Sequence, residues 1–245
     1  MKTIDEWLNS PEIKKVKDLP TRKLITESIN RDPLRAVFYD PKVFYSPADG
    51  VILFAKIVKP DQDILNIKGV EYTINSLIKK EIKDTCLIIS IFMTCYDVHV
   101  NRTPTDGFYW HKHLDAIKVM NLSMRPVESG IIDRIGIKKE DLVYGVYNER
   151  VVNDVLYPEI GQKYYIVQIA DFEVDVIAHF AQPNDFFTQG ERFAIVRLGS
   201  QVDLIIPFTN KKLTFNFVAE EGCHVEAGID KLIEVEGMNP AYYAD

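Results

Sequence analysis

The sequence predicts a mainly β (α+β) fold, with a β-sandwich or barrel-like body, a hammerhead-like C-terminal region and a helical N-terminal segment. From about residue 39 onward, short runs rich in β-branched and aromatic residues follow one another, as is typical of strands. Clusters of Pro, Asp, Asn and Gly separate these runs and predict turns. Strands do not alternate with long helical patterns, so a doubly wound parallel sheet is not expected.

The helical segment occupies residues 1–35. Pro11 directly after Ser10, and Thr21 directly after Pro20, have the pattern of helix starts. The segment carries eight Lys or Arg against six Asp or Glu, so it is mildly basic on an acidic body. Two interpretations follow: a helical cap on the core, or a peripheral contact with an anionic membrane surface.

The chain is expected to form a single domain over residues 1–245, because no linker or repeat divides it. A short helix is predicted over residues 74–80. The strand-turn-strand pattern over residues 171–235 is similar to that of biotinyl and lipoyl carrier folds. Strands are predicted over residues 51–58, 87–93, 96–100, 164–169, 174–180, 193–198, 202–206 and 213–218.

Composition and charge limit the function. The 245 residues are 47% hydrophobic and 27% charged, an ordinary globular balance. The net charge of −7 argues against a protein whose main partner is nucleic acid. Three cysteines without a CxxC motif support neither a disulfide framework nor a zinc ribbon, and a reducing interior is expected. The most apolar run, residues 86–95, is about half of the roughly 20 residues that cross a bilayer.

Three polar constellations occur where predicted strands begin or end. Ser46-Pro-Ala-Asp-Gly50 is a turn that places Asp49 at the start of a strand, although such an Asp commonly caps its own backbone. In residues 97–104, period-two alternation places Asp97, His99 and Asn101 on one face. Gly199-Ser200 lies between two apolar strands, where glycine often marks a bulge or bend. His111 and His113 also alternate, but no third residue has the spacing of a metal site, so no metal is expected.

Taken together, these segments resemble the phosphatidylserine decarboxylase family, whose members are pyruvoyl-dependent proenzymes. The resemblance covers nearly the whole chain and is closest to a shorter-chain subgroup. The segments that carry it, in order, are Arg31-Asp-Pro-Leu-Arg35, Ser46-Pro-Ala-Asp-Gly50, Ile67-Lys-Gly-Val-Glu-Tyr72, residues 97–104, Asn148-Glu-Arg150, Gly190-Glu-Arg-Phe193, Leu198-Gly-Ser200 and Val225-Glu-Ala-Gly228.

The resemblance implies that this chain is a zymogen that cleaves itself. The hydroxyl of Ser200 would attack the carbonyl of Gly199, and the resulting ester would eliminate and hydrolyse to leave a pyruvoyl group in place of Ser200. The cut would give a β chain of residues 1–199 and an α chain of residues 200–245. The pyruvoyl group would be the cofactor, acting as electron sink when carbon dioxide leaves a substrate amine, much as pyridoxal phosphate does.

The resemblance also implies the residues that assist cleavage. The Asp of the family's PADG turn is Asp49 here. The family's longer members carry two histidines in the segment that matches residues 97–104, and the second is the one usually assigned as the base. Only the first is present, as His99, because Arg102 stands at the second place. We therefore expect His99, with Asp49, to serve self-cleavage and later to protonate the carbanion.

The implied function is a lyase of phospholipid biosynthesis that converts phosphatidylserine to phosphatidylethanolamine. The substrate lies in a bilayer, so Trp7, Leu8 and Ile25 of the N-terminal helices are candidates for membrane contact. The expected location is cytoplasmic and peripheral at the membrane surface. The expected partners are the phospholipid, the paired α and β chains and a second copy in a homodimer. Two alternatives remain: a related decarboxylase of a soluble amino acid or its phosphoester, and an unprocessed, non-catalytic binding protein.

Overall fold

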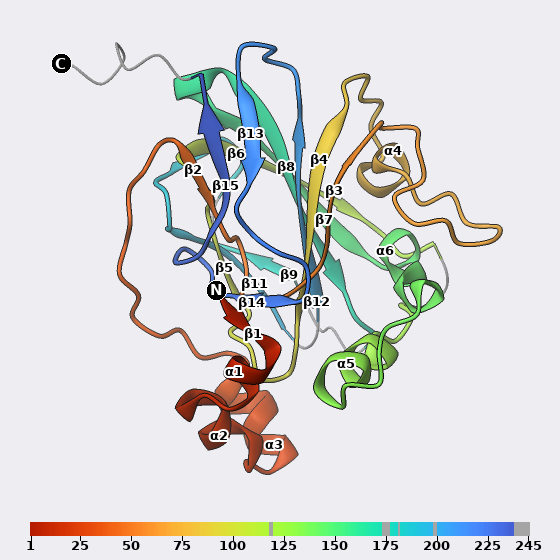
Figure 1. Ribbon diagram of the computed structural model, residues 1–245, viewed down its shortest axis with the longest axis vertical. Helices are drawn as coiled ribbons and strands as arrows, with labels where there is room; N and C mark the ends of the chain where they lie inside the picture. The colour runs from red at the N-terminus through yellow and green to blue at the C-terminus, as the bar shows by residue number, and fades with distance from the viewer. Residues whose placement is uncertain (118–119, 173–176, 181, 198–199, 238–245) are drawn as a thin grey trace.

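The computed structural model describes residues 1–117, 120–172, 177–180, 182–197 and 200–237, and the side chains of Thr21 and Ile25 also lie outside the described part. One antiparallel sheet of nine strands dominates the molecule (Figure 1). Its strands in spatial order are β1 (Lys2–Thr3), β14 (Cys223–Val225), β3 (Gly50–Val58), β4 (Cys86–Met93), β12 (Ser200–Pro207), β8 (Gln162–Ala170), β7 (Arg150–Tyr157), β6 (Gly107–Leu114) and β10 (Asp185–Phe187).

Two small sheets pack on one face of the large sheet. The first has the order β5 (Val100–Arg102), β11 (Arg192–Val196) and β9 (Ile177–His179), and the second β13 (Thr214–Phe217), β15 (Lys231–Glu236) and β2 (Val43–Tyr45). Side chains from both small sheets join one apolar core with the large sheet, including Phe44, Phe193 and Val235. The mainly β prediction is confirmed. The body is a layered sandwich rather than a barrel, since the large sheet runs open from β1 to β10.

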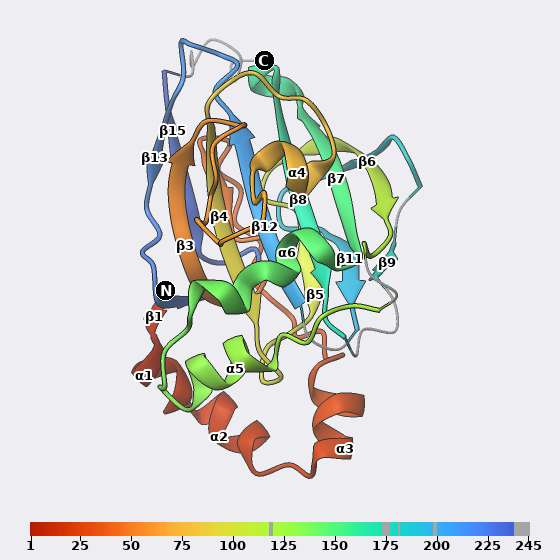
Figure 2. The ribbon, with the colours of Figure 1, turned by 90° about the vertical axis from the view of Figure 1, so that its right-hand side faces the viewer.

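Helices cover the opposite face (Figure 2). They are α4 (Ile74–Ile78), α5 (Arg125–Ile132), the 3₁₀ helix η2 (Lys139–Val143) and α6 (Tyr144–Tyr147); a short 3₁₀ turn, η3 (Pro158–Ile160), follows β7. Leu77, Val127 and Tyr144 from these helices form a second core with the large sheet. Because both faces are covered, every residue of β4 is buried, which explains its unbroken apolar sequence.

The N-terminal helices gather at one end of the sandwich (Figure 1). They are α1 (Ile4–Leu8), α2 (Pro11–Lys17), α3 (Thr21–Lys23) and the π-helix η1 (Leu24–Ser28). The Thr3 side chain caps α1, and Ser10 caps α2, whose first residue is Pro11. The expected starts at Pro11 and Thr21 are therefore confirmed.

Some expected elements differ from the structure. Residues 95–97 form a turn, so the strand expected over 96–100 begins only at Val100. The carboxylate of Asp97 stabilises this turn, because its Oδ2 accepts hydrogen bonds from both the backbone and the hydroxyl of Thr94. Strands β6 and β7 were not predicted from the sequence. The part of the expected strand over residues 174–176 lies outside the described residues.

Candidate active site

Ser200 is the first residue of β12, in the middle of the large sheet. It pairs with Met93 of β4 on one side and with Ala170 of β8 on the other. Its side chain is completely buried, and its Oγ has no hydrogen-bond partner within the described part of the chain. A buried hydroxyl without a partner costs free energy, so it is the kind of atom that a function explains. Gly199, the other residue of the expected cleavage site, lies outside the described residues.

The side chain of Ser200 faces the core that contains the small sheets. Directly paired residues in a sheet point to the same face, and Met93 and Ala170 both belong to that core. Ala194 and Val196 of β11 belong to it as well. Ser200 is therefore enclosed between the large sheet and the layer formed by β5, β11 and β9.

His99 contacts Val196, the residue from which the chain continues to Ser200. Its Nδ1 is 3.1 Å from the carbonyl oxygen of Val196, which ends β11, and its Nε2 is 3.1 Å from that of Thr94, the residue after Met93. Burial lowers the pKa of His99, while the two carbonyl oxygens and nearby Asp97 act in the opposite direction. The neutral ring can donate to one carbonyl only, so its second nitrogen keeps a free lone pair.

Asp49 is held in a buried ion pair. Both of its oxygens lie 2.6 Å from the guanidinium of Arg35, and Oδ1 also accepts a hydrogen bond from the backbone of Ala227 at 2.8 Å. Gly228 donates to the carbonyl oxygen of Ser46 at 2.8 Å. Three segments far apart in the sequence therefore meet here: residues 31–35, 46–50 and 225–228. No hydrogen bond among the described residues joins Asp49 to His99 or Ser200.

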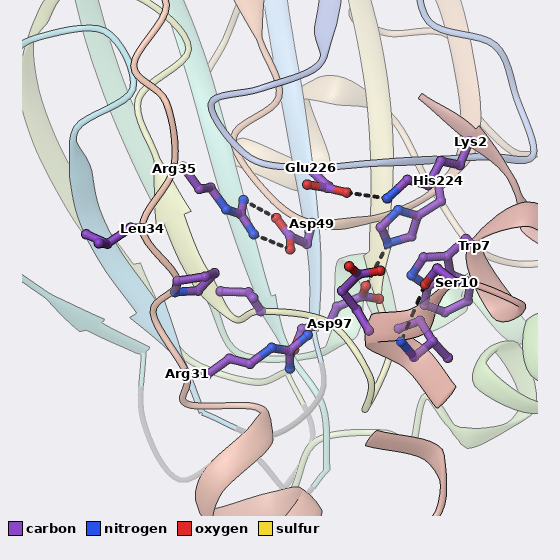
Figure 3. A pocket seen from close by; sticks show the side chains of 14 residues that line it. Lys2, Trp7, Ser10, Arg31, Leu34, Arg35, Asp49, Asp97, His224 and Glu226 are labelled. Carbon is purple, nitrogen blue, oxygen red and sulfur yellow. Dashed lines mark hydrogen bonds and ion pairs between the residues drawn. The ribbon is translucent and has the colours of Figure 1, made fainter. Parts of the chain in front are cut away.

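A pocket of about 210 Å³ lies between the N-terminal helices and the body (Figure 3). Two ion pairs, Arg35 with Asp49 and Lys2 with Glu226, line it together with the hydrogen-bonded side chains of His224 and Asp97. The Nε2 of His224 is 2.7 Å from Asp97 Oδ1, and the His224 ring stacks on Trp7 at 4.5 Å. His224 was not predicted as a site residue, because nothing in its sequence neighbourhood indicates a partner 127 positions away.

The structure corrects the expected arrangement of Asp97, His99 and Asn101 on one strand face. Asp97 lies in the turn before β5 and contacts His224, whereas Asn101 contacts Met93 and Gln168. Arg102, at the place of the family's second histidine, donates to the carbonyl oxygen of Gly190 at 2.9 Å and pairs with Asp32 at 3.2 Å. Its guanidinium is a clamp between segments and cannot serve as a base.

The structure also corrects the expected role of Trp7. Its side chain is only 2% exposed and packs against His224 and Tyr96, so it is not available to a bilayer. Leu8 is half-buried. The side chain of Ile25 lies outside the described part. Among the described residues, no helix has both the length and the apolar character needed to cross a membrane.

A buried serine hydroxyl without a described partner, and a buried histidine that contacts the ends of the two segments flanking it, are the elements of a site for nucleophilic chemistry. Comparisons with known proteins agree. Residues 23–231 match the family model described as phosphatidylserine decarboxylase. This match covers most of the chain, which therefore belongs to the phosphatidylserine decarboxylase family.

Individual relatives are similar over most of this chain. A phosphatidylserine decarboxylase proenzyme of Desulfotalea psychrophila is 33% identical over 178 residues, 72% of this chain and 66% of the relative. One of Rickettsia akari is 30% identical over 177 residues, 72% of this chain and 62% of the relative. A putative archaetidylserine decarboxylase proenzyme of Methanocaldococcus jannaschii is 27% identical over 207 residues, 84% of this chain and 87% of the relative. This chain thus spans somewhat under two thirds of some relatives and most of others.

Proposed function

We propose that this chain is a pyruvoyl-dependent phosphatidylserine decarboxylase, which releases carbon dioxide and forms phosphatidylethanolamine after autocatalytic cleavage between Gly199 and Ser200. The observation that carries the proposal is Ser200 itself: a buried hydroxyl without a described partner, at the residue that matches the family's cleavage site. Family membership favours this function over the non-catalytic binding protein.

The residues around Ser200 fit a pyruvoyl group made from that residue. The Oγ atom has no described hydrogen bond that would be lost, and the position at the start of β12 is buried. At this place the group supplies a ketone that withdraws electrons from a bound substrate amine. Strand pairing with Met93 and Ala170 would hold it in position on both sides.

We assign the role of base to His99. Taking a proton from Ser200 would convert its ring to an imidazolium, which can donate to the carbonyls of Val196 and Thr94 at the same time. The two carbonyl oxygens thus favour the charged ring that proton transfer produces. In the later reaction the same ring could return a proton to the carbanion.

We assign Asp49 a role through its partners. Its ion pair with Arg35 and its hydrogen bond from Ala227 hold together three of the segments that carry the family resemblance. Because the pair is buried, removal of either partner would leave an uncompensated charge. Asp49 therefore fixes the geometry of the cleavage region.

We also propose that the enzyme works peripherally at a membrane surface on the cytoplasmic side, as a pair of α and β chains and as a homodimer. Exposed Lys and Arg side chains support the membrane contact better than the buried Trp7 side chain does. Helices α2 and α3 carry exposed basic side chains that have no ion pair among the described residues: Lys14, Lys15, Lys17, Arg22 and Lys23. Each such cation near an anionic bilayer contributes about 1 kcal/mol.

A lipid assay tests the function. Processed protein is incubated with vesicles that contain phosphatidylserine, and the ethanolamine lipid is measured by mass spectrometry. Parallel arms use an ether-linked archaeol phosphoserine lipid, because relatives carry that name, and soluble O-phosphoserine. Turnover of the first lipid supports the proposal. Processed protein that forms no ethanolamine lipid, or that turns over only the soluble compound, would contradict it.

A further inference from the structure

A chain of three buried amides leads toward Ser200 on the same face of the large sheet. Asn153 Nδ2 donates to Gln168 Oε1 at 3.0 Å, and Gln168 Nε2 donates to Asn101 Oδ1 at 2.7 Å. Asn101 Nδ2 ends the chain at the sulfur of Met93, 3.6 Å away. All three side chains are at most 1% exposed. Met93 is the residue that pairs directly with Ser200.

One backbone atom fixes the direction of the whole chain. Asn153 Nδ2 also donates to the carbonyl oxygen of Ile166 at 3.0 Å, and a carbonyl oxygen can only accept. This orients Asn153, whose amide then orients Gln168, and Gln168 in turn requires the oxygen of Asn101 to face it. The amide nitrogen of Asn101 must therefore point the other way, toward Met93.

The Asn101 amide nitrogen is consequently a weakly paired donor that contacts Met93, the strand partner of Ser200. The amide nitrogen carries two N–H groups, and its one acceptor within the described residues is a thioether sulfur, which is a weak acceptor. Buried amides usually have stronger partners. Ser200, which pairs with Met93 in the ladder, carries a buried hydroxyl that also lacks a described partner. A weakly paired donor and a hydroxyl without a described partner thus lie on one face of the sheet.

We propose that Asn101, oriented by Gln168 and Asn153, stabilises the negative charge that forms on the peptide carbonyl oxygen when Ser200 attacks it. In this step the Oγ–C bond forms, Oγ gives up its proton, the peptide C–N bond breaks and the nitrogen takes a proton. An ester and an amine result. A donor placed in advance in a buried site stabilises such an oxyanion strongly. The inference rests on the proposed self-cleavage and adds to it a positioning relay that no family motif indicated.

To test this, the precursor is freshly translated and the rate of its conversion into two chains is measured on denaturing gels. Asn101→Asp keeps the shape but replaces the donor by an acceptor, and cleavage is expected to slow by about 10²- to 10³-fold. Gln168→Glu leaves Asn101 in place but cannot donate to its oxygen, so the Asn101 amide turns and cleavage slows as well. This second variant decides the matter if Asn101→Asp fails to fold, as judged by circular dichroism.

Gln162→Glu is the matched control. Gln162 is a completely buried amide on the same strand as Gln168, but it donates to the carbonyl oxygen of Pro207 at the far end of β12. It introduces the same carboxylate away from Ser200, and its precursor is expected to cleave at the rate of the unaltered chain. If all three variants slow equally, the effect belongs to buried charge and the inference is wrong.

Hydroxylamine separates the steps, because it cleaves esters. If the relay promotes ester formation, hydroxylamine will not restore cleavage of Asn101→Asp. Cleavage of Asn101→Asp and Gln168→Glu at the unaltered rate, or full rescue by hydroxylamine, would overturn the inference. An unaltered chain that never cleaves would instead overturn the proposed function itself.

Discussion

Asp203 shows at the scale of one residue what burial does to a charge. Its Oδ1 accepts a hydrogen bond from Gln201 at 2.8 Å, but its Oδ2 has no partner within the described residues. Burial raises the pKa of Asp203 to about 7, and the nearby Ser90 hydroxyl and the hydrogen bond from Gln201 only partly offset this. The folded protein therefore keeps a proton that the unfolded chain releases near pH 4.

This difference predicts a pH dependence of stability. Because the pKa is raised in the folded state, Asp203 makes its full contribution to the free energy of unfolding below about pH 4. This contribution is lost as the pH rises to about 7. The shift corresponds to about 4 kcal/mol as an upper estimate. Asp203→Asn should flatten the free energy of unfolding between pH 4 and 7, measured by urea titration. Asp154→Asn, at a partly exposed carboxylate, is the control; parallel curves for unaltered and Asp203→Asn protein would contradict the account.

His99 gives a second prediction at this scale. His99→Ala should leave the precursor uncleaved, or slow cleavage by about 10²- to 10⁴-fold, because the serine loses its base. His179→Ala is the control, since the half-buried His179 ring stacks on His111, and His179 pairs with Ala194 within β11 rather than contacting Val196 at its end. Gels of both precursors provide the measurement, and normal processing and turnover of His99→Ala would rule out the assigned role.

The turn that carries Asp49 depends on the close approach of the Gly50 backbone to strand β4. Gly50 starts β3 with a φ of +152°, and a Cβ at this position would lie 2.2 Å from the carbonyl oxygen of Phe92 in β4. A backbone atom in a central strand cannot move aside. The Asp-Gly sequence thus lets the turn enter the sheet while Asp49 reaches Arg35.

Gly50→Ala should consequently destabilise the fold by roughly 3 kcal/mol or more. Gly69→Ala is the matched control: its φ of +77° is also unfavourable for alanine, but no atom lies within 4 Å of the added Cβ. That variant should lose only roughly 1–2 kcal/mol. Thermal unfolding of the two proteins measures the difference, and equal losses would show that the approach to β4 does not matter.

Elements were predictable from the sequence where the pattern is strong and local. The Ser10-Pro11 start of α2 and the apolar run of β4 were predicted for the reasons the structure confirms. Strand β7 was missed because buried polar residues such as Arg150 and Asn153 interrupt its apolar pattern. Arg150 is tolerated because it donates to four backbone carbonyl oxygens, and those partners come from tertiary structure.

The site divides in the same way. Ser200, His99 and Asp49 were predicted as site residues because each lies in a short motif that one sequence is enough to recognise. His224 and the amide chain through Gln168 could not be found, since each depends on strand order and register. Pairing brings Gln168 beside Val202 and Met93 beside Ser200, and nothing local in the sequence states which strands are neighbours.

At the scale of the whole molecule, the proposed cut falls inside the fold. The proposed α chain, residues 200–245, supplies β12 to the middle of the large sheet, where it pairs with β4 and β8 along most of its length. The same chain supplies β14 to the large sheet and β13 and β15 to one of the small sheets. The two chains should therefore remain associated after cleavage and separate only under denaturing conditions.

The mass of the denatured protein tests the central claim most directly. We predict two chains, of 199 and 46 of the 245 residues, with the smaller one lighter by one ammonia than a chain that begins with serine. Ser200→Ala protein should remain a single chain of 28.2 kDa. A single chain of that mass from the unaltered sequence, folded and incubated to completion, would contradict the account.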